Sequence, residues 1–163
     1  LDTDPHAIKT AGYATVICMR EDSEPTIHLP TDPTTGPVDN NEFSDANGNY
    51  NSTAERLAFE AVGVKWVYLP LGSNADSTLQ PVDWTAAKFE EYKPAMQAAE
   101  AAGPVLTHCQ DGYRSAAYSI AYVAQKAGKC TDWAVQEAKY IGFAFDTPDN
   151  VQIVTFFKDV LKC

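Results

Sequence analysis

The stretch VLTHCQDGYRSAAYSIAYVAQKAG, from Val105 to Gly128, decides the fold. A short apolar run, which is typical of a buried strand, passes directly into a long alanine-rich segment that is typical of a helix. Cys109 and Arg114 lie five positions apart where the strand gives way to the helix, with a glycine between them. Either the cysteine is only a small residue in a tight turn, or the loop binds an anion and carries a nucleophile.

Strand and helix patterns alternate along the chain. Three short apolar runs bounded by turn residues predict strands at 13–19, 64–70 and 104–108. A helical pattern precedes each of them, and three more follow Cys109. This alternation predicts an α/β fold, a small parallel β-sheet flanked by helices with a helical C-terminal third, in a single domain of residues 1–163. The predicted helices cover residues 4–12, 52–63, 82–103, 114–128, 131–143 and 147–162.

Several residues predict how these helices begin and bend. Pro94 lies inside a helical pattern and should kink or split it. Ser52 and Glu55 have the spacing of a capping box, in which two side chains satisfy backbone N–H groups at the start of a helix. Thr131 and Thr147 are the expected N-caps of the last two helices.

Charge and hydropathy exclude some functions. The chain has 163 residues and a formal net charge of -10, which argues against nucleic acid or an anionic membrane as its main partner. No apolar run approaches the roughly 20 residues of a membrane-spanning helix. Because the chain begins at Leu1 rather than methionine, we expect processing or trimming, and the cytoplasm is only slightly favoured over secretion or an organelle.

The cysteines and histidines do not have the spacing of metal ligands. The four cysteines are far apart and form no C-x-x-C pair, and the three histidines are isolated, so we expect no metal and no cofactor. Cys130 and Cys163 each follow a helical pattern. A disulfide between these two residues is one open alternative.

Residues 21–51 do not fit a compact α/β unit. They are rich in Pro, Asp, Asn, Gly and Thr, and such a long segment without a periodic pattern tends to be functional or exposed. Asp45, Asn47 and Asn49 alternate as they would in a calcium-binding loop, but Tyr50 stands where that loop requires glycine. We therefore interpret 21–51 as a long solvated loop inserted after the first strand.

Ligands of parallel sheets bind beyond the carboxyl ends of the strands. This rule places three segments along one edge of the predicted sheet. Residues 20–22 follow the first strand, residues 71–76 follow the second, and residues 109–115 follow the third. Cys109 is therefore expected where chemistry takes place rather than in the core.

The loop after Cys109 has the residue types of an anion site. Gly112 permits a turn in which backbone N–H groups point inward, and the following helix adds its positive N-terminal end. This environment favours a thiolate at Cys109, and the planar Arg114 guanidinium matches two oxygens of an oxyanion. Ser115 is expected to donate a hydrogen bond to the sulfur when it leaves, and His108 to orient the loop. The anion-binding residues would be Gln110, Asp111, Gly112, Tyr113 and Ser115.

The segment HCQDGYRS resembles the His-Cys…Arg-Ser/Thr signature of cysteine-dependent protein phosphatases, including the dual-specificity type. It is more similar still to the phosphatase-like domain of beta-lactamase hydrolase-like proteins, which share HC-x-x-G-x-RS. The likeness also includes AGYATVICMREDSE, GVKWVYLPL and AGPVLTHC, and it spans roughly residues 8–125 outside the long insertion. This resemblance implies a phosphatase-like fold and a phosphorylated substrate.

The length of the loop departs from the tyrosine phosphatase pattern. Those enzymes have five residues between cysteine and arginine, and this chain has four, from Gln110 to Tyr113. A loop of this length resembles that of rhodanese-type sulfurtransferases, whose cysteine carries a persulfide. Asp111 also places a negative charge near the anion site unless its side chain points outward.

A phosphatase also needs a general acid that protonates the leaving oxygen. By the resemblance, Asp76 in LGSNADST is the best candidate, because dual-specificity enzymes keep their aspartate on the loop after the corresponding strand. Asp83 in PVDW is instead interpreted as a cap of the following helix.

The sequence thus predicts a cysteine-dependent phosphatase that hydrolyses phosphate monoesters through a phosphocysteine at Cys109, with Arg114 and Asp76 as its partners in catalysis. Two alternatives stay open. One is a rhodanese-like sulfurtransferase with a persulfide on Cys109, and the other is a module that binds an oxyanion or a partner without turnover. The expected partner is a phosphorylated or sulfur-carrying small molecule or protein, and neither nucleic acid nor membrane.

Overall fold

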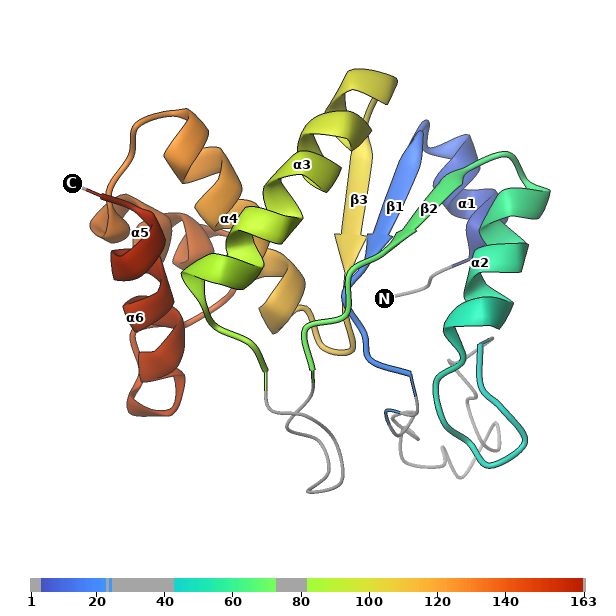
Figure 1. Ribbon diagram of the computed structural model, residues 1–163, viewed down its shortest axis with the longest axis horizontal. Coiled ribbons are helices and arrows are strands. Elements are labelled where there is room, and N and C mark those ends of the chain that lie inside the picture. The colour runs from blue at the N-terminus through green and yellow to red at the C-terminus, as the bar shows by residue number, and fades with distance from the viewer. Residues whose placement is uncertain (1–3, 23, 25–42, 73–81, 163) are drawn as a thin grey trace.

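The centre of the fold is a parallel sheet of three short strands, β1 (Thr15–Cys18), β2 (Lys65–Tyr68) and β3 (Val105–His108), in the order β2-β1-β3 (Figure 1). The three predicted strands and the α/β class are confirmed, and each strand is shorter than its apolar run. The structure is a computed structural model that describes residues 4–22, 24, 43–72 and 82–162.

The central strand β1 is buried along its whole length, because it is paired on both sides and covered on both faces. Its last residue, Cys18, lies opposite Tyr68 of β2 on one side and opposite His108 of β3 on the other. The carboxyl ends of all three strands lie at the same edge of the sheet (Figure 1). Whatever follows β1, β2 and β3 therefore meets at this edge.

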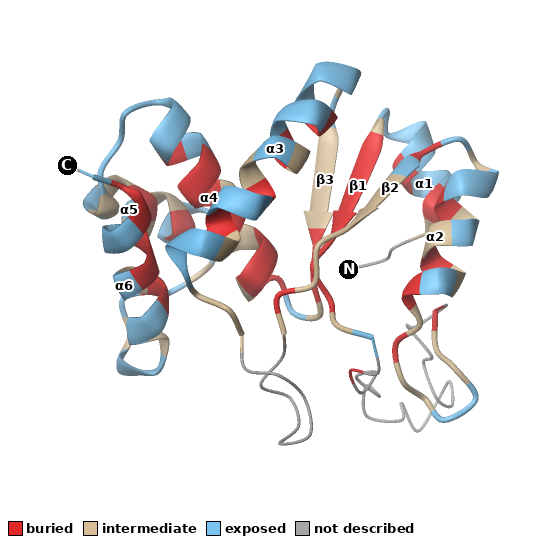
Figure 2. Cartoon of the chain, in the orientation of Figure 1, coloured by how far each residue is buried: buried red, intermediate tan, exposed pale blue. Residues whose placement is uncertain are grey.

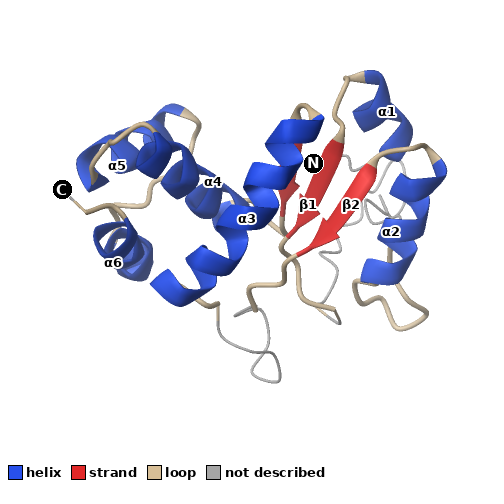
Figure 3. Ribbon diagram, turned by 45° about the horizontal axis from the view of Figure 1, so that its top comes forward, coloured by secondary structure: helices blue, strands red, loops and turns tan. Residues whose placement is uncertain are grey.

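Two groups of helices cover the two faces of the sheet (Figures 1 and 3). The first two helices pack on one face through a core that includes Ile8, Val16 and Phe59. The other four enclose the larger core on the opposite face. The helices are α1 (Pro5–Thr10), α2 (Ser52–Ala61), α3 (Ala86–Ala102), α4 (Tyr113–Lys126), α5 (Thr131–Tyr140) and α6 (Val151–Val160), with a 3-10 turn at Pro148–Asn150.

Aromatic side chains from α3, α4 and α6 fill the larger core. The rings of Tyr118 and Phe156 stack with their centroids 4.7 Å apart, and Phe89 and Tyr92 meet this pair edge-on. Burial of rings of this size supplies a large share of the apolar area that folding removes from water. Figure 2 shows the buried sides of these helices turned toward one another. The helical C-terminal third is therefore part of the core of the fold.

Helix α3 begins and continues differently from the prediction. It runs through Pro94 without ending, because its buried side packs against the sheet and the other helices on that face. Its N-cap is Thr85, whose Oγ1 accepts a hydrogen bond from the backbone N–H of Lys88 at 3.2 Å and donates one to Asp83 at 2.6 Å. The predictions that Pro94 splits the helix and that Asp83 caps it are therefore wrong, whereas a kink at Pro94 stays a prediction.

The start of α2 also differs. Asn51 is the N-cap and accepts a hydrogen bond from the N–H of Ala54, so Ser52 is already inside the helix. The Ser52 hydroxyl instead donates to the carboxylate of Asp22 at 2.8 Å, and Glu55 is buried against the sheet. The predicted capping box is wrong, because both of its side chains have tertiary partners.

The last helices begin close to the predicted positions, but with other caps. Helix α5 begins at Thr131 with Cys130 in the N-cap position, and Thr147 precedes the 3-10 turn without a side-chain cap hydrogen bond. Cys130 is disulfide-bonded, whereas Cys163 lies outside the described residues. No helix in the described part of the chain is both long and apolar enough to cross a membrane.

The described ends of the 21–51 segment belong to the packed structure. Glu24 is fully buried, and Phe43 and Tyr50 are 5% and 3% exposed. Phe43 and Tyr50 form a small core with Cys18 beside β1. The prediction of a solvated loop is therefore wrong at both ends of the segment, and residues 25–42 lie outside the described residues.

Substitution of a glycine tests how tightly the loop before α4 is packed. Gly112 has a left-handed φ of 95°, and a Cβ at this position would lie 2.8 Å from Cζ of Phe143. We expect Gly112→Ala to lower the free energy of unfolding by about 3 kcal/mol, combining backbone strain with the steric conflict. Urea denaturation measures this loss.

Gly128→Ala is the matched control. Gly128 also has a left-handed φ, 62°, but a Cβ there would meet nothing within 4 Å. This variant should lose only about 1 kcal/mol, which is the cost of the left-handed backbone alone. Equal losses in the two variants would show that the contact with Phe143 does not constrain the loop.

Candidate active site

The residues that follow the three strands meet at the carboxyl edge of the sheet. Arg20 and Glu24 follow β1, Gly72 follows β2, and Cys109 follows β3. The side chain of Arg114 at the start of α4 joins these segments through the hydrogen bonds described below. Asp76, the predicted general acid, lies outside the described residues.

Neighbouring residues at the end of β3 face opposite sides of the sheet. His108 lies opposite Cys18 and points to the face that α2 covers, where it contacts Glu55. Cys109 belongs to the larger core on the other face, next to α4, and is 8% exposed. The alternation of side chains along a strand thus separates the predicted nucleophile from its histidine neighbour.

The loop from Cys109 to Gly112 leads directly into the N-terminus of α4. The first intrahelical hydrogen bond runs from the N–H of Ala116 to the carbonyl of Gly112 at 2.8 Å. The N–H groups of the first turn therefore have no acceptor within the helix, and the positive end of the helix dipole lies beside Cys109. An anion next to the sulfur would find these donors already oriented.

Ser115 lies within reach of the predicted nucleophile. Its Oγ is 3.6 Å from Sγ of Cys109 and 3.1 Å from the carbonyl oxygen of Gly112. The single hydroxyl proton thus has two acceptors, a carbonyl and a sulfur. A negative charge on the sulfur would attract this proton more strongly than the carbonyl does.

The other loop residues have separate environments. Asp111 is exposed, and its Oδ1 accepts the N–H of Tyr113 at 3.4 Å, so the carboxylate is directed to the backbone of the helix start. The ring of Tyr113 packs edge-on against Phe143 with centroids 5.2 Å apart. Gln110 is half-buried. Of these side chains, only that of Asp111 carries charge.

Arg114 is held by a buried carboxylate. Its Nη1 and Nη2 donate to Oε1 and Oε2 of Glu24 at 2.5 and 2.9 Å, and the two residues are 4% and 0% exposed. Nη1 also donates to the carbonyls of Met19 at 3.2 Å and Gly72 at 2.5 Å. Arg20 donates to the same carboxylate through Nε at 3.3 Å. The guanidinium is therefore fixed by residues that follow β1 and β2.

The contact with Glu24 leaves one edge of the guanidinium for an anion. The hydrogen bonds to Met19, Gly72 and Glu24 occupy both Nη1 protons and one Nη2 proton, and the guanidinium also interacts with Cys109. The Nε proton and the second Nη2 proton share one edge of the planar group, which is the fork that matches two oxyanion oxygens. Burial alone would lower the pKa of Arg114, but Glu24 and then Cys109 raise it overall, so the group stays charged.

On the α2 face, His108 lies against a second buried carboxylate. Its Nε2 is 3.0 Å from Oε1 of Glu55. Burial raises the pKa of Glu55, but the nearby His108 and then the hydrogen bonds from Tyr50 and Trp66 outweigh burial and lower it. Glu55 is therefore ionised at neutral pH and anchors the residue next to Cys109.

A cleft of about 700 Å³ opens at the same edge of the sheet. Leu71 and Gly72 line one side of the cleft. This side lies next to Arg114, because the guanidinium donates a hydrogen bond to the carbonyl of Gly72. Glu21, Asp22 and Asp83 add carboxylates to its lining. Gly72 connects this cleft to Arg114, whereas no residue of the loop that follows Cys109 lines it.

Comparisons with known proteins identify the fold. No family model and no curated protein matches the chain. A DUF442 protein from Shewanella putrefaciens CN-32 is 19% identical, with a TM-score of 0.59 and coverage of 99% of this chain and 84% of that chain. TpbA of P. aeruginosa is 20% identical, with a TM-score of 0.56 and coverage of 96% and 72%. A Neisseria meningitidis z2491 protein is 17% identical, with a TM-score of 0.56 and coverage of 96% and 87%.

The Shewanella and Neisseria proteins are candidate phosphatases, and the chain has the same phosphatase-like fold. The structure brings Cys109, Arg114 and Ser115 together, whereas the side chain of His108 lies on the other face of the sheet. It adds Glu24, which orients Arg114, and Glu55, which holds His108. The acidic run after the first strand was a signal for Glu24, whereas nothing in the sequence distinguished Glu55 from a surface helix residue.

Removal of the Glu24 charge tests whether the ion pair supports the site. Glu24→Gln leaves the buried Arg114 charge without its carboxylate, so we expect the free energy of unfolding to fall by about 3 kcal/mol. Glu60→Gln breaks an exposed ion pair with Arg56 and should change stability by less than about 0.5 kcal/mol. Urea denaturation of both variants makes the comparison, and a loss below about 1 kcal/mol in Glu24→Gln would contradict the anchoring role.

Proposed function

We propose that the protein is a cysteine-dependent phosphatase that hydrolyses phosphate monoesters through a phosphocysteine on Cys109. One observation carries the proposal. Cys109 leaves the end of β3 beside the N-terminus of α4, and Glu24 holds Arg114 of the same turn with one edge of the guanidinium left for an anion. A nucleophile, a positive helix end and an oriented guanidinium are the parts that phosphoryl transfer requires.

In the first step, Sγ of Cys109 attacks phosphorus while the bond from phosphorus to the ester oxygen breaks. The leaving oxygen takes a proton from a general acid. The equatorial oxygens are bound by backbone N–H groups of the loop and by the free edge of Arg114. In the second step, water attacks phosphorus, the bond from sulfur to phosphorus breaks, and Ser115 donates a hydrogen bond to the departing sulfur. Inorganic phosphate and the starting thiolate result.

We assign the general acid to Asp76 from the sequence resemblance, because it follows β2 on the loop that carries the aspartate of dual-specificity phosphatases. The same residue would deprotonate the attacking water in the second step. The assignment of the chain to the group of beta-lactamase hydrolase-like phosphatase domains rests on the shared motif HC-x-x-G-x-RS.

An aryl phosphate is the substrate class that the comparisons favour. A cysteine-to-serine variant of TpbA has been crystallised in complex with pTyr. By analogy, we propose phosphotyrosine, on a protein or as a small molecule, as a substrate of this chain.

The four-residue loop between Cys109 and Arg114 favours a second candidate function, sulfur transfer. In this reaction Sγ of Cys109 accepts a sulfane sulfur from thiosulfate and releases sulfite, and cyanide then removes the sulfur as thiocyanate. Neither step needs a general acid on a leaving oxygen. The buried Glu24–Arg114 pair serves an oxyanion donor equally well, so enzymatic assays must separate the two functions.

Side-by-side assays of Cys109→Ser and wild type test the nucleophile. Wild type is expected to release phosphate from phosphotyrosine and from para-nitrophenyl phosphate, and Cys109→Ser to lose at least about 10³-fold in kcat. Circular dichroism controls for folding. Thiocyanate formation without phosphate release would replace the phosphatase with a sulfurtransferase. Oxyanion binding without either reaction would indicate a binding module.

Substrates with poor and good leaving groups test whether Asp76 is the general acid. Asp76→Asn should slow hydrolysis of an alkyl phosphate, whose oxygen leaves poorly, by about 10²-fold, because general acid catalysis contributes about this much. Hydrolysis of an aryl phosphate with a good leaving group should change by less than about 3-fold, since that oxygen departs without a proton. Asp83→Asn is the control, because Asp83 accepts a hydrogen bond from Thr85. Equal slowing of both substrates would assign another role to Asp76.

A further inference from the structure

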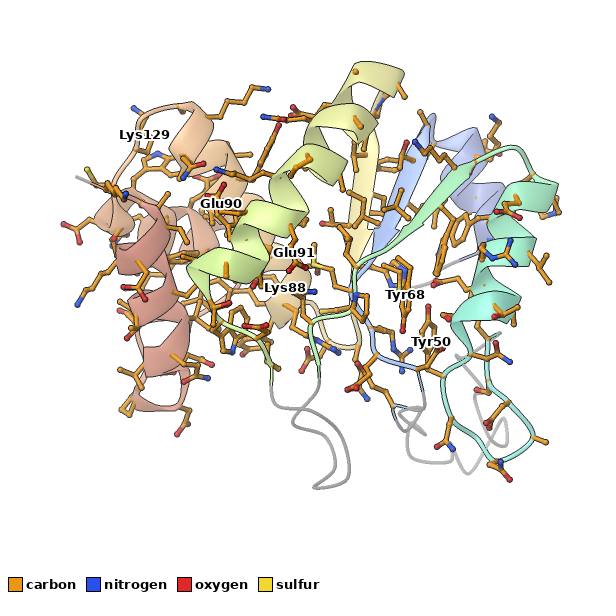
Figure 4. All side chains as sticks on the ribbon, viewed as in Figure 1. Tyr50, Tyr68, Lys88, Glu90, Glu91 and Lys129 are labelled. Carbon is orange, nitrogen blue, oxygen red and sulfur yellow. The ribbon has the colours of Figure 1, made fainter. Side chains whose placement is uncertain are left out.

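A second group of reactive side chains is buried directly behind the candidate active site, on the face that α2 covers. Cys18 ends β1, His108 ends β3, and Glu55 lies on α2. Their exposed fractions are 0%, 7% and 1%. Tyr50 covers the group and is 3% exposed. Figure 4 shows Tyr50 beside Tyr68, in the space between the strands and α2. The reaction proposed above uses neither Cys18 nor Glu55 as a reactant.

The donor atoms of these side chains converge. Sγ of Cys18, a carboxylate oxygen of Glu55 and a ring nitrogen of His108 all lie within 4.8 Å of one another. Nε2 of His108 is 3.0 Å from Oε1 of Glu55, yet the two do not have hydrogen-bond geometry, and Nε2 is buried without a hydrogen-bond partner. A buried ring nitrogen that has no hydrogen bond and lies among other donor atoms requires an explanation, and a bound ion is one.

We propose that Cys18, Glu55 and His108 form a binding site for one divalent transition-metal ion of the zinc type. A thiolate, an imidazole and a carboxylate are the three donor classes that zinc uses in proteins. Zinc bonds of about 2.0–2.3 Å place tetrahedral ligands of these types about 3.3–3.5 Å apart, so the side chains need to close by up to about 1.5 Å. The register between β1 and β3, which sets Cys18 opposite His108, already aligns two of the three ligands.

Charge balance favours a divalent ion in this place. Zn²⁺ with the Cys18 thiolate, the Glu55 carboxylate and a neutral His108 has a net charge of zero, which suits a buried site. The Cys18 thiol proton is released to solvent when the metal binds, since the ligand is the thiolate. Trp66 donates to Oε2 of Glu55 at 3.2 Å and leaves Oε1 for the metal. Such outer contacts orient a carboxylate ligand.

The position of Tyr50 assigns a structural role to the metal. The tyrosine hydroxyl lies 2.9 Å from Sγ of Cys18 and donates to Glu55, so it occupies the remaining side of the cluster. A site closed in this way stabilises the fold rather than activating a water. The metal would join β1, β3 and α2 one residue before Cys109 and so brace the base of the nucleophile loop.

Cobalt binding tests the site in the intact protein. Cobalt(II) added to metal-stripped wild type should bind one to one and give a thiolate-to-metal charge-transfer band. Cys18→Ser should lose the charge-transfer band, and Glu55→Gln should bind at least about tenfold more weakly. Zinc should displace the cobalt and raise the thermal midpoint of wild type but not of Cys18→Ser.

Two controls locate the metal and guard against unfolding. Cys109→Ser should keep the charge-transfer band, because Cys18 and Cys109 are the free cysteines among the described residues. Tyr50→Phe removes the hydroxyl hydrogen bonds but no metal ligand, so it should still bind cobalt. Absence of stoichiometric binding to wild type, or loss of the band in Cys109→Ser with retention in Cys18→Ser, would overturn the proposal. Neither result would bear on the phosphatase assays.

Discussion

The buried ion pair between Arg114 and Glu24 is the interaction on which the rest of the site depends. A guanidinium that is 4% exposed requires a compensating charge, because an unpaired charge in the interior costs several kcal/mol. Glu24 supplies this charge from the segment after β1, and the carbonyl of Gly72 adds an acceptor after β2. The start of α4 is thereby tied to the ends of two strands. Since Cys109 lies between β3 and α4, the position of its sulfur relative to the helix N-terminus follows from this pair.

The alternation of apolar runs predicted the strands and helices, because burial on a sheet or under a helix selects hydrophobic residues wherever they occur. Some of the predictions that failed were local ones. Pro94 is exposed and does not interrupt α3, because other residues of the helix, such as Tyr92 and Met96, are buried in the core. Ser52 and Glu55 do not form a capping box, because each has a tertiary partner. A helix signal that depends on three or four neighbouring residues carries no information about such an environment.

The two carboxylates that organise the site could not be identified from the sequence for the same reason. Glu24 lies in an acidic run that resembles a solvated loop, and its partner Arg114 is 90 residues away in the chain. Glu55 lies in the first turn of α2, which has the sequence of an ordinary amphipathic helix. What distinguishes both from surface glutamates is complete burial, and burial of a charge is a property of the assembled fold. The motif residues from His108 to Ser115 were predictable because strand, loop and helix are consecutive there.

The alternation of side chains at the end of β3 places the nucleophile on one face of the sheet and the residues that hold its backbone on the other. His108 is buried with Glu55 and Cys18 on the α2 face, while Cys109 faces the larger core and α4. Because the two residues share a peptide bond, any contact that fixes the imidazole also fixes the backbone from which the sulfur extends. Glu24 acts in the same way on Arg114 from the other side. The four-residue loop is thus held at both ends by a buried carboxylate. A loop with few backbone donors needs this rigidity, since it must present each donor to an anion without reorganisation.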